Sequence, residues 1–81
     1  MKAKPSTPVA QHLTASMRVV ASHLHVRRAT VDTARDTVLD AARRIAAGDT
    51  SPELDVLRLR LEKATGVTIA ELEKHAAAWP V

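Results

Sequence analysis

Hydrophobic residues recur at steps of three and four along most of the chain, which is the spacing of one face of an α-helix. The first series fits a helix over residues 9–24 and consists of Val9, Leu13, Met17, Val20 and Leu24. A second series follows a break at residues 25–29 and consists of Val31, Ala34, Val38, Ala42 and Ile45. Thr30 can cap this helix, predicted over residues 30–47, and Gly48 can end it. Thr14 offers an alternative cap for a shorter first helix.

The second half of the chain carries two more helix signals. Ser51 followed by Pro52 is typical of a helix start. The serine side-chain oxygen can accept a hydrogen bond from a free backbone amide, and proline suits the first helical position because an amide there would have no partner within the helix. Gly66 ends that helix, predicted over residues 52–65, and Thr68 with Glu71 forms a capping box for a last helix over residues 69–79. The pattern predicts an all-α fold, a compact bundle of about four helices. Residues 9–81 would form a single domain behind a flexible basic arm, residues 1–8.

The helix over residues 52–65 has an unusually broad apolar face. Two stripes make it up, and together they contain Leu54, Val56, Leu57, Leu59 and Leu61. A face of this width is typical of a helix sandwiched between neighbours or lying in an interface. These five residues are therefore a candidate dimer or partner face.

Composition narrows the class of protein. The chain has 81 residues, so its core is small, and oligomerisation would help to stabilise it. There is no cysteine, which excludes disulfides and thiolate metal sites. No apolar run approaches the roughly 18 residues of a membrane helix, and no signal sequence is recognisable, so we expect a cytoplasmic protein. The net charge of +3 favours anionic partners.

The segment from Met17 to Asp36 carries a further pattern. Counted from Met17, the fourth, fifth, eighth, tenth and fifteenth places hold Val20, Ala21, Leu24, Val26 and Val31. This layout resembles the helix-turn-helix of bacterial repressors, in which a small residue at the fifth place lets two helices cross closely. The resemblance implies a tight turn at His25, where glycine is usual because positive φ is often needed, and a second helix laid in the DNA major groove. A cap at Thr30 would place that turn later than the repressor pattern does.

The function that the resemblance implies is a small transcriptional regulator that binds double-stranded DNA. The side chains at or near the groove would be those of Arg27, Arg28, Thr30, Thr33 and Arg35. Asp32 and Asp36 share this face, and they would repel phosphates unless they accept from a base amine. The last two helices would pair two subunits as a homodimer on a palindromic site.

A protein-binding role is the alternative. A compact helical adaptor or inhibitor, such as a phage or mobile-element protein that blocks a host complex, could dock its leucine face and basic rim on an acidic protein surface. Enzymatic activity is not expected, because the chain has no nucleophile motif, Gly-rich phosphate loop or paired catalytic carboxylates. No cofactor is expected, and no pair among the four histidines has the four-residue spacing of helical metal ligands.

Overall fold

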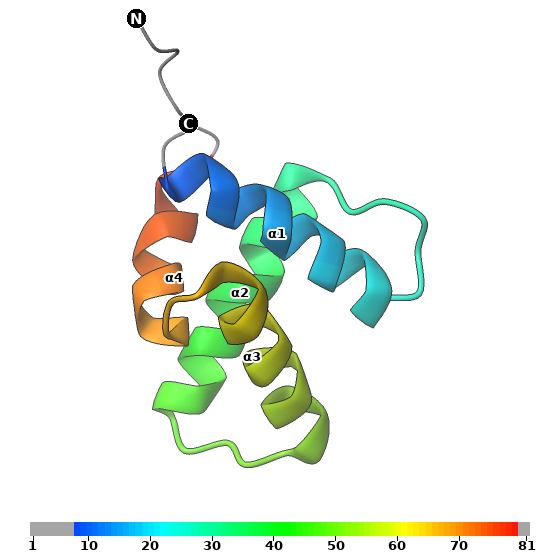
Figure 1. The fold of residues 1–81 in the computed structure, drawn as a ribbon. Helices are drawn as coiled ribbons and strands as arrows, with labels where there is room; N and C mark the ends of the chain where they lie inside the picture. The colour runs from blue at the N-terminus through cyan, green and yellow to red at the C-terminus, as the bar shows by residue number, and fades with distance from the viewer. Residues whose placement is uncertain (1–7, 80–81) are drawn as a thin grey trace, which may run out of the picture.

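The computed structural model describes residues 8–79, and within that range it contains four α-helices and no strand. They are α1 (Pro8–His23), α2 (Val31–Ala46), α3 (Pro52–Thr65) and α4 (Ile69–Ala77) (Figure 1). The predicted all-α bundle is confirmed, and every helix begins and ends within two residues of its predicted bounds. The shorter first helix is not formed. The predicted basic arm lies outside the described residues except for Pro8, which is the first residue of α1.

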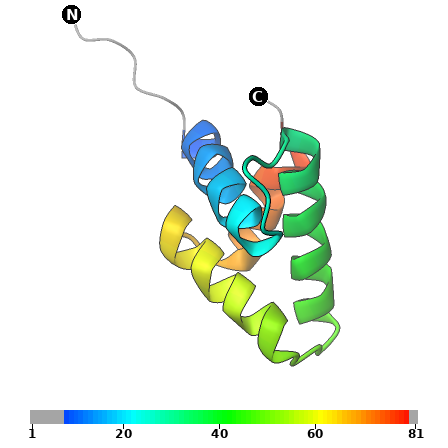
Figure 2. The same cartoon turned by 90° about the vertical axis from the view of Figure 1, so that its right-hand side faces the viewer.

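The four helices pack around a core of small and branched side chains. Each helix contributes at least one side chain that is 0% exposed, and these include Val20, Val38, Leu61 and Leu72. The closest packing joins α1 to α3 and α2 to α4, as two views of the ribbon show (Figures 1 and 2). Trp79, the only Phe, Trp or Tyr of the chain, is 3% exposed and seals the core just beyond α4.

Local signals fix the start of α4. Thr68 has extended backbone angles, and its side chain accepts from the amide of Glu71, as the predicted capping box requires. The carboxylate of Glu62 in α3 accepts a second free amide, that of Ile69, at 2.8 Å. Gly66, with φ of +79°, ends α3 in the left-handed region. The turn between α3 and α4 is therefore held by both helices.

The start of α3 differs from its prediction. Ser51 precedes Pro52 as expected, but its side chain caps no amide of the helix. Its hydroxyl and its amide both donate to Asp49, which also pairs with Arg44 at 2.9 Å. These hydrogen bonds from Ser51, and then that from Arg44, lower the pKa of Asp49 to about 2. A carboxylate two residues earlier has outcompeted the helix amides for the serine.

Candidate nucleic-acid interface

The end of α1 sets the shape of the loop that follows it. The amide of His25 donates to the carbonyl of Ser22 (3.2 Å), and that of Val26 donates to the carbonyl of Ala21 (2.9 Å). This pair of bonds defines a Schellman motif, whose turning residue adopts a left-handed conformation. His25 is that residue, with φ of +58°, and so it occupies a position where glycine is usual.

The second helix starts later than the repressor pattern would place it. Thr30 is extended, its side chain accepts from the amide of Thr33 at 3.1 Å, and α2 begins at Val31. The predicted cap at Thr30 is confirmed. The connection spans residues 24–30, longer than the turn of about three or four residues in a helix-turn-helix. The turn expected at His25 is formed, with positive φ, and five residues outside any helix, 26–30, separate it from α2.

Three of the five residues predicted to bind nucleic acid make contacts within the chain. Thr30 and Thr33 serve the cap, and their hydroxyls are also hydrogen-bonded to each other at 2.9 Å. The guanidinium of Arg35 donates to the backbone carbonyl of Trp79 at 2.9 Å and pairs with Asp32 at 3.4 Å. Arg35 therefore joins α2 to the segment just beyond α4, and its side chain is only partly exposed.

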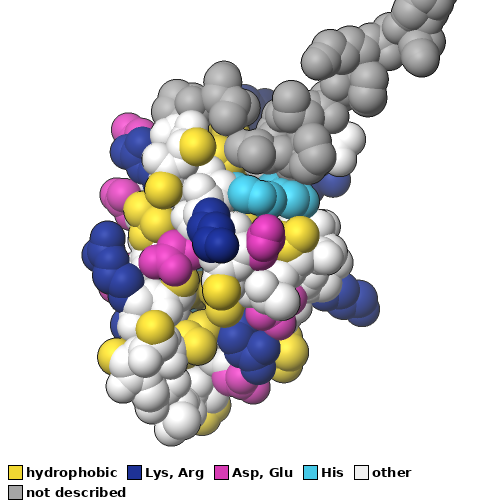
Figure 3. All heavy atoms as spheres, turned by 90° about the vertical axis from the view of Figure 1, so that its left-hand side faces the viewer, with side chains coloured by type: hydrophobic (Ala, Val, Ile, Leu, Met, Phe, Trp, Pro, Cys, Tyr) yellow, Lys and Arg dark blue, Asp and Glu magenta, His cyan; other side chains and the backbone are white. Residues whose placement is uncertain are grey.

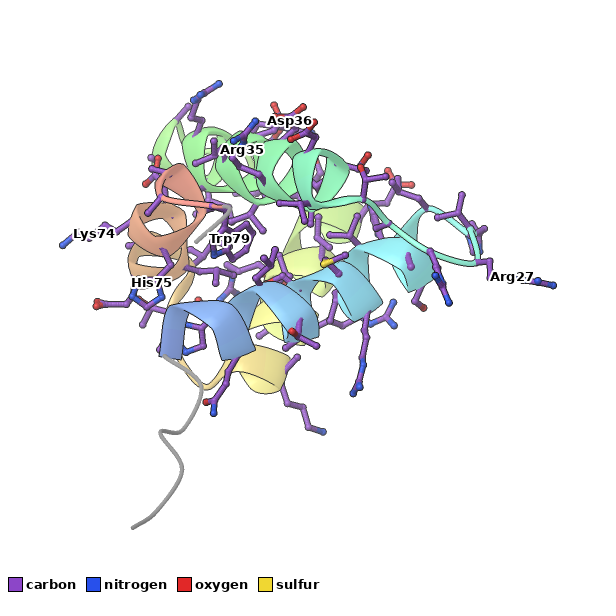
Figure 4. All side chains as sticks on the ribbon, turned by 90° about the horizontal axis from the view of Figure 1, so that it is seen from above. Arg27, Arg35, Asp36, Lys74, His75 and Trp79 are labelled. Carbon is purple, nitrogen blue, oxygen red and sulfur yellow. The ribbon has the colours of Figure 1, made fainter. Side chains whose placement is uncertain are left out.

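The other two predicted residues, Arg27 and Arg28, are exposed in the loop between α1 and α2. Arg27 points away from the bundle (Figure 4). With Arg18 of α1 they line a shallow cleft of about 140 Å³, whose other lining residues are the small or apolar Met17, Ala21 and Ala29. We call Arg18, Arg27 and Arg28 the arginine edge. The structure adds Arg18 to the predicted pair.

The arginine edge carries positive charge that the described part of the chain leaves unneutralised. None of its three guanidinium groups makes a hydrogen bond or ion pair within residues 8–79. Arg44 and Arg58, by contrast, each pair with two carboxylates, and the hydrogen bond that Arg58 donates to Asp55 raises the pKa of Arg58 above its usual value. Three arginines without a partner among the described residues thus lie beside one cleft.

The exposed face of α2 mixes carboxylates with arginines. Asp32 pairs with Arg35 at 3.4 Å, and Asp40 pairs with Arg44 at 3.9 Å. Asp32, Asp36 and Asp40 follow one another at four-residue spacing and are all exposed. Asp36 lies on the outer side of the helix (Figure 4). On the face over α4, acidic and basic side chains are mixed with histidine and apolar ones, with no patch of a single sign (Figure 3). The helix that the resemblance would lay in the groove therefore presents three carboxylates, of which Asp36 alone has no ion pair within residues 8–79.

The predicted partner face on α3 requires correction. Leu54, Leu57 and Leu61 are 5%, 4% and 0% exposed, because they pack against the other helices. They belong to the core and cannot form a surface. Val56 and Leu59 are 52% and 51% exposed, so only these two remain available.

Two histidines meet across the bundle, which no local pattern indicates. Nδ1 of His12 in α1 lies 2.5 Å from Nδ1 of His75 in α4, and the ring planes differ by 9°. Burial first, and then His75, lower the pKa of His12, against an opposing effect of Glu71. Among the described residues no group of three or more His, Cys, Asp or Glu could hold a metal ion. The pair joins α1 to α4.

No protein-family model, curated protein or solved structure matches this chain. Within residues 8–79, no helix combines the length and the apolar character needed to span a membrane.

Proposed function

We propose that this domain binds double-stranded DNA through the arginine edge, as a small regulator of DNA transactions such as transcription. The observation that carries the proposal is the set of three exposed, unpaired guanidinium groups of Arg18, Arg27 and Arg28 beside one cleft. Guanidinium groups recognise phosphate oxygens with several fixed donors, and neutralised phosphates release counterions. The net charge of +3 adds attraction at longer range.

The positions of the charged side chains agree better with binding to the phosphate backbone than with insertion of α2 into the major groove. Asp32, Asp36 and Asp40 would lie close to phosphates if α2 lay in the major groove, and carboxylates there are repelled unless they accept from a base amine. Arg35, which was expected at or near the groove, donates to the backbone carbonyl of Trp79. Phosphate contacts position a protein but carry no base sequence. We therefore expect weak sequence preference, with a Kd of roughly 1 to 100 µM at physiological salt.

The helix-turn-helix form of the proposal makes a different prediction. A repressor-like arrangement would use α2 as the reading helix and would discriminate strongly between DNA sequences. Competition between a labelled duplex and unlabelled duplexes of scrambled sequence separates the two forms. Equal competition supports backbone binding, and a preference of about a thousandfold or more supports groove reading.

The test of DNA binding is fluorescence anisotropy of a labelled duplex over a range of salt concentrations. Each phosphate neutralised contributes about −0.9 to the slope of log K against log salt. The wild type should therefore give a slope near −3, and the double variant Arg27→Ala/Arg28→Ala a slope reduced in magnitude by about two. Arg43→Ala is the matched control, because Arg43 is an exposed arginine in the last turn of α2.

The control should bind as the wild type does. Equal binding by the double variant and the wild type would remove the arginine edge from the proposal. Circular dichroism of each variant checks that helix content is unchanged, which is expected because both loop side chains are exposed.

A protein partner is the second candidate, and the cleft itself favours it. Its small, largely apolar lining next to three arginines suits an apolar side chain of a partner that carries flanking carboxylates. A heparin column at moderate salt does not separate the two ideas, because both use the same charge. Binding of an acidic peptide with one central leucine, measured by calorimetry against the same duplex, does separate them.

A further inference from the structure

The side of α3 that faces away from the core has not been assigned a role. Its outer face consists of Glu53, Val56, Leu59, Arg60 and Lys63, all of them exposed. The spacing of these residues keeps them within one stripe of the helix. In Figure 2 the helix lies at the edge of the bundle, and no other described helix covers that side. Half-exposed valine and leucine thus lie side by side between charged residues.

Charge is arranged along this stripe from negative to positive. Glu53 lies in the first turn of α3, Val56 and Leu59 in the middle, and Lys63 in the last turn. Arg60 is held in place near the middle, since its guanidinium donates to Ser22 at 2.8 Å. Lys63 makes no ion pair within residues 8–79. A surface with this order is complementary to itself when two copies are antiparallel.

We propose that a second copy of this chain docks on the outer face of α3, with the two α3 helices antiparallel about a twofold axis. Glu53 of each copy would then face Lys63 of the other, and Val56 would pack against the aliphatic stem of Arg60. Leu59 lies close to the axis and completes the apolar centre. The arrangement is isologous, so that each contact occurs twice.

The size of the face sets the strength of the association. A helix of 14 residues is about 21 Å long, and two such helices bury less than the roughly 1,200 Å² of a stable interface. A weak dimer is expected, with a Kd of roughly 10 µM to 1 mM. In DNA binding it would present two arginine edges, but the dimer itself does not rest on that function.

Sedimentation of the full chain without nucleic acid measures the association. The weight-average mass should rise from 8.7 kDa toward twice that value as concentration approaches about 1 mM. Leu59→Lys should keep the mass at that of the monomer, since it places a charge at the apolar centre. Asp36→Lys is the control, because it changes a charge on the exposed face of α2, and it should associate as the wild type does.

A charge exchange tests the antiparallel geometry. Glu53→Lys and Lys63→Glu should each weaken self-association about tenfold or more, because like charges then face each other twice. In an equimolar mixture of these two variants, one contact is native and the other is reversed in sign. The mixture should therefore associate with a Kd within about threefold of the wild type.

Two results would overturn the inference. A wild type that is monomeric at about 1 mM would mean that another protein, or water alone, covers the face. A mixture that associates no better than its separate components would exclude the antiparallel pairing. Neither result bears on the arginine edge, whose test uses dilute protein and a duplex.

Discussion

At the scale of single residues, His25 departs furthest from the preference of its side chain. It adopts φ of +58° as the turning residue of a Schellman motif after α1. Gly48 holds the equivalent place after α2, with φ of +90°. A left-handed conformation costs a residue with a Cβ about 1 to 2 kcal/mol, whereas glycine adopts it freely. The turn after α1 therefore has a residue with a Cβ at its left-handed position, and the turn after α2 has glycine there.

Exchange of the residue type at these two turns should change stability in opposite directions. His25→Gly should stabilise the domain by about 0.5 to 1 kcal/mol, because relief of the left-handed cost exceeds the added entropy of the unfolded chain. Gly48→Ala should destabilise it by about 1 kcal/mol. No atom lies within 4 Å of a Cβ at Gly48, so the cost there is purely conformational. Urea unfolding measures both, and a loss of stability in His25→Gly would contradict the explanation.

The contacts of the individual arginines could not be predicted from the sequence. The sequence places Arg27, Arg28 and Arg35 in one candidate site. Arg35 instead binds the carbonyl of Trp79, 44 residues away, which depends on how α4 returns to α2. Arg18 joins the other two because the loop turns back along α1. Both contacts depend on how the helices pack, which the spacing of residues along the sequence does not indicate.

At the scale of helices, caps made the boundaries predictable. Thr30 and Thr68 each accept an amide from the third residue after them, as the sequence predicts. The shape of the connection over residues 24–30 was less predictable, since several turn types suit the same residues. Ser51 was predicted wrongly as a side-chain cap, because Asp49 competes for its hydroxyl.

The side chains of the residues that precede α2, α3 and α4 should therefore contribute differently to the stability of the domain. Thr30→Ala and Thr68→Ala should each cost about 1 kcal/mol, since a free amide at the helix start loses its acceptor. Ser51→Ala should cost less, because its side chain caps no helix amide. Thermal unfolding of the three variants gives the comparison. A loss in Ser51→Ala as large as in Thr68→Ala would show that the serine does cap α3.

The contact between α1 and α4 should make stability depend on pH. The pKa of His12 lies below its ordinary value of 6.5 in the folded protein, chiefly through burial and then through His75. The unfolded chain therefore binds a proton more readily, and stability is complete above pH 6.5 and decreases as pH falls toward the folded pKa. The melting temperature should be lower at about pH 5 than at about pH 7.5.

Two variants identify the source of that dependence. His12→Leu should reduce the difference in melting temperature between the two pH values, because it removes the buried imidazole. His25→Asn replaces an exposed histidine with a residue that tolerates positive φ, so the difference in melting temperature between the two pH values should be unchanged. An undiminished pH dependence in His12→Leu would assign the effect to other groups.

At the scale of the whole molecule, packing separates residues that the sequence groups together. Leu59 and Leu61 both belong to the predicted apolar face of α3, yet one is 51% exposed and the other 0%. The number of helices and their bounds could be predicted from period and caps. Which side of a broad apolar helix faces the core could not, because that depends on where α1 and α4 pack.

The two leucines should respond differently to truncation. Leu61→Ala should cost about 3 kcal/mol, because it leaves a cavity among four helices. Leu59→Ala should change the free energy of unfolding by less than about 0.5 kcal/mol in dilute solution. Urea titration at low protein concentration measures both. Similar losses in the two variants would place Leu59 in the core as well.

We propose that the arginine edge, rather than the exposed face of α2, meets DNA. Amide chemical shifts of isotopically labelled protein, followed by NMR during titration with a short duplex, test it most directly. We expect the largest shifts at Arg18 and over residues 26–29, with residues 32–40 little changed. Largest shifts over residues 32–40, or no shift at the arginine edge at saturating DNA, would contradict it.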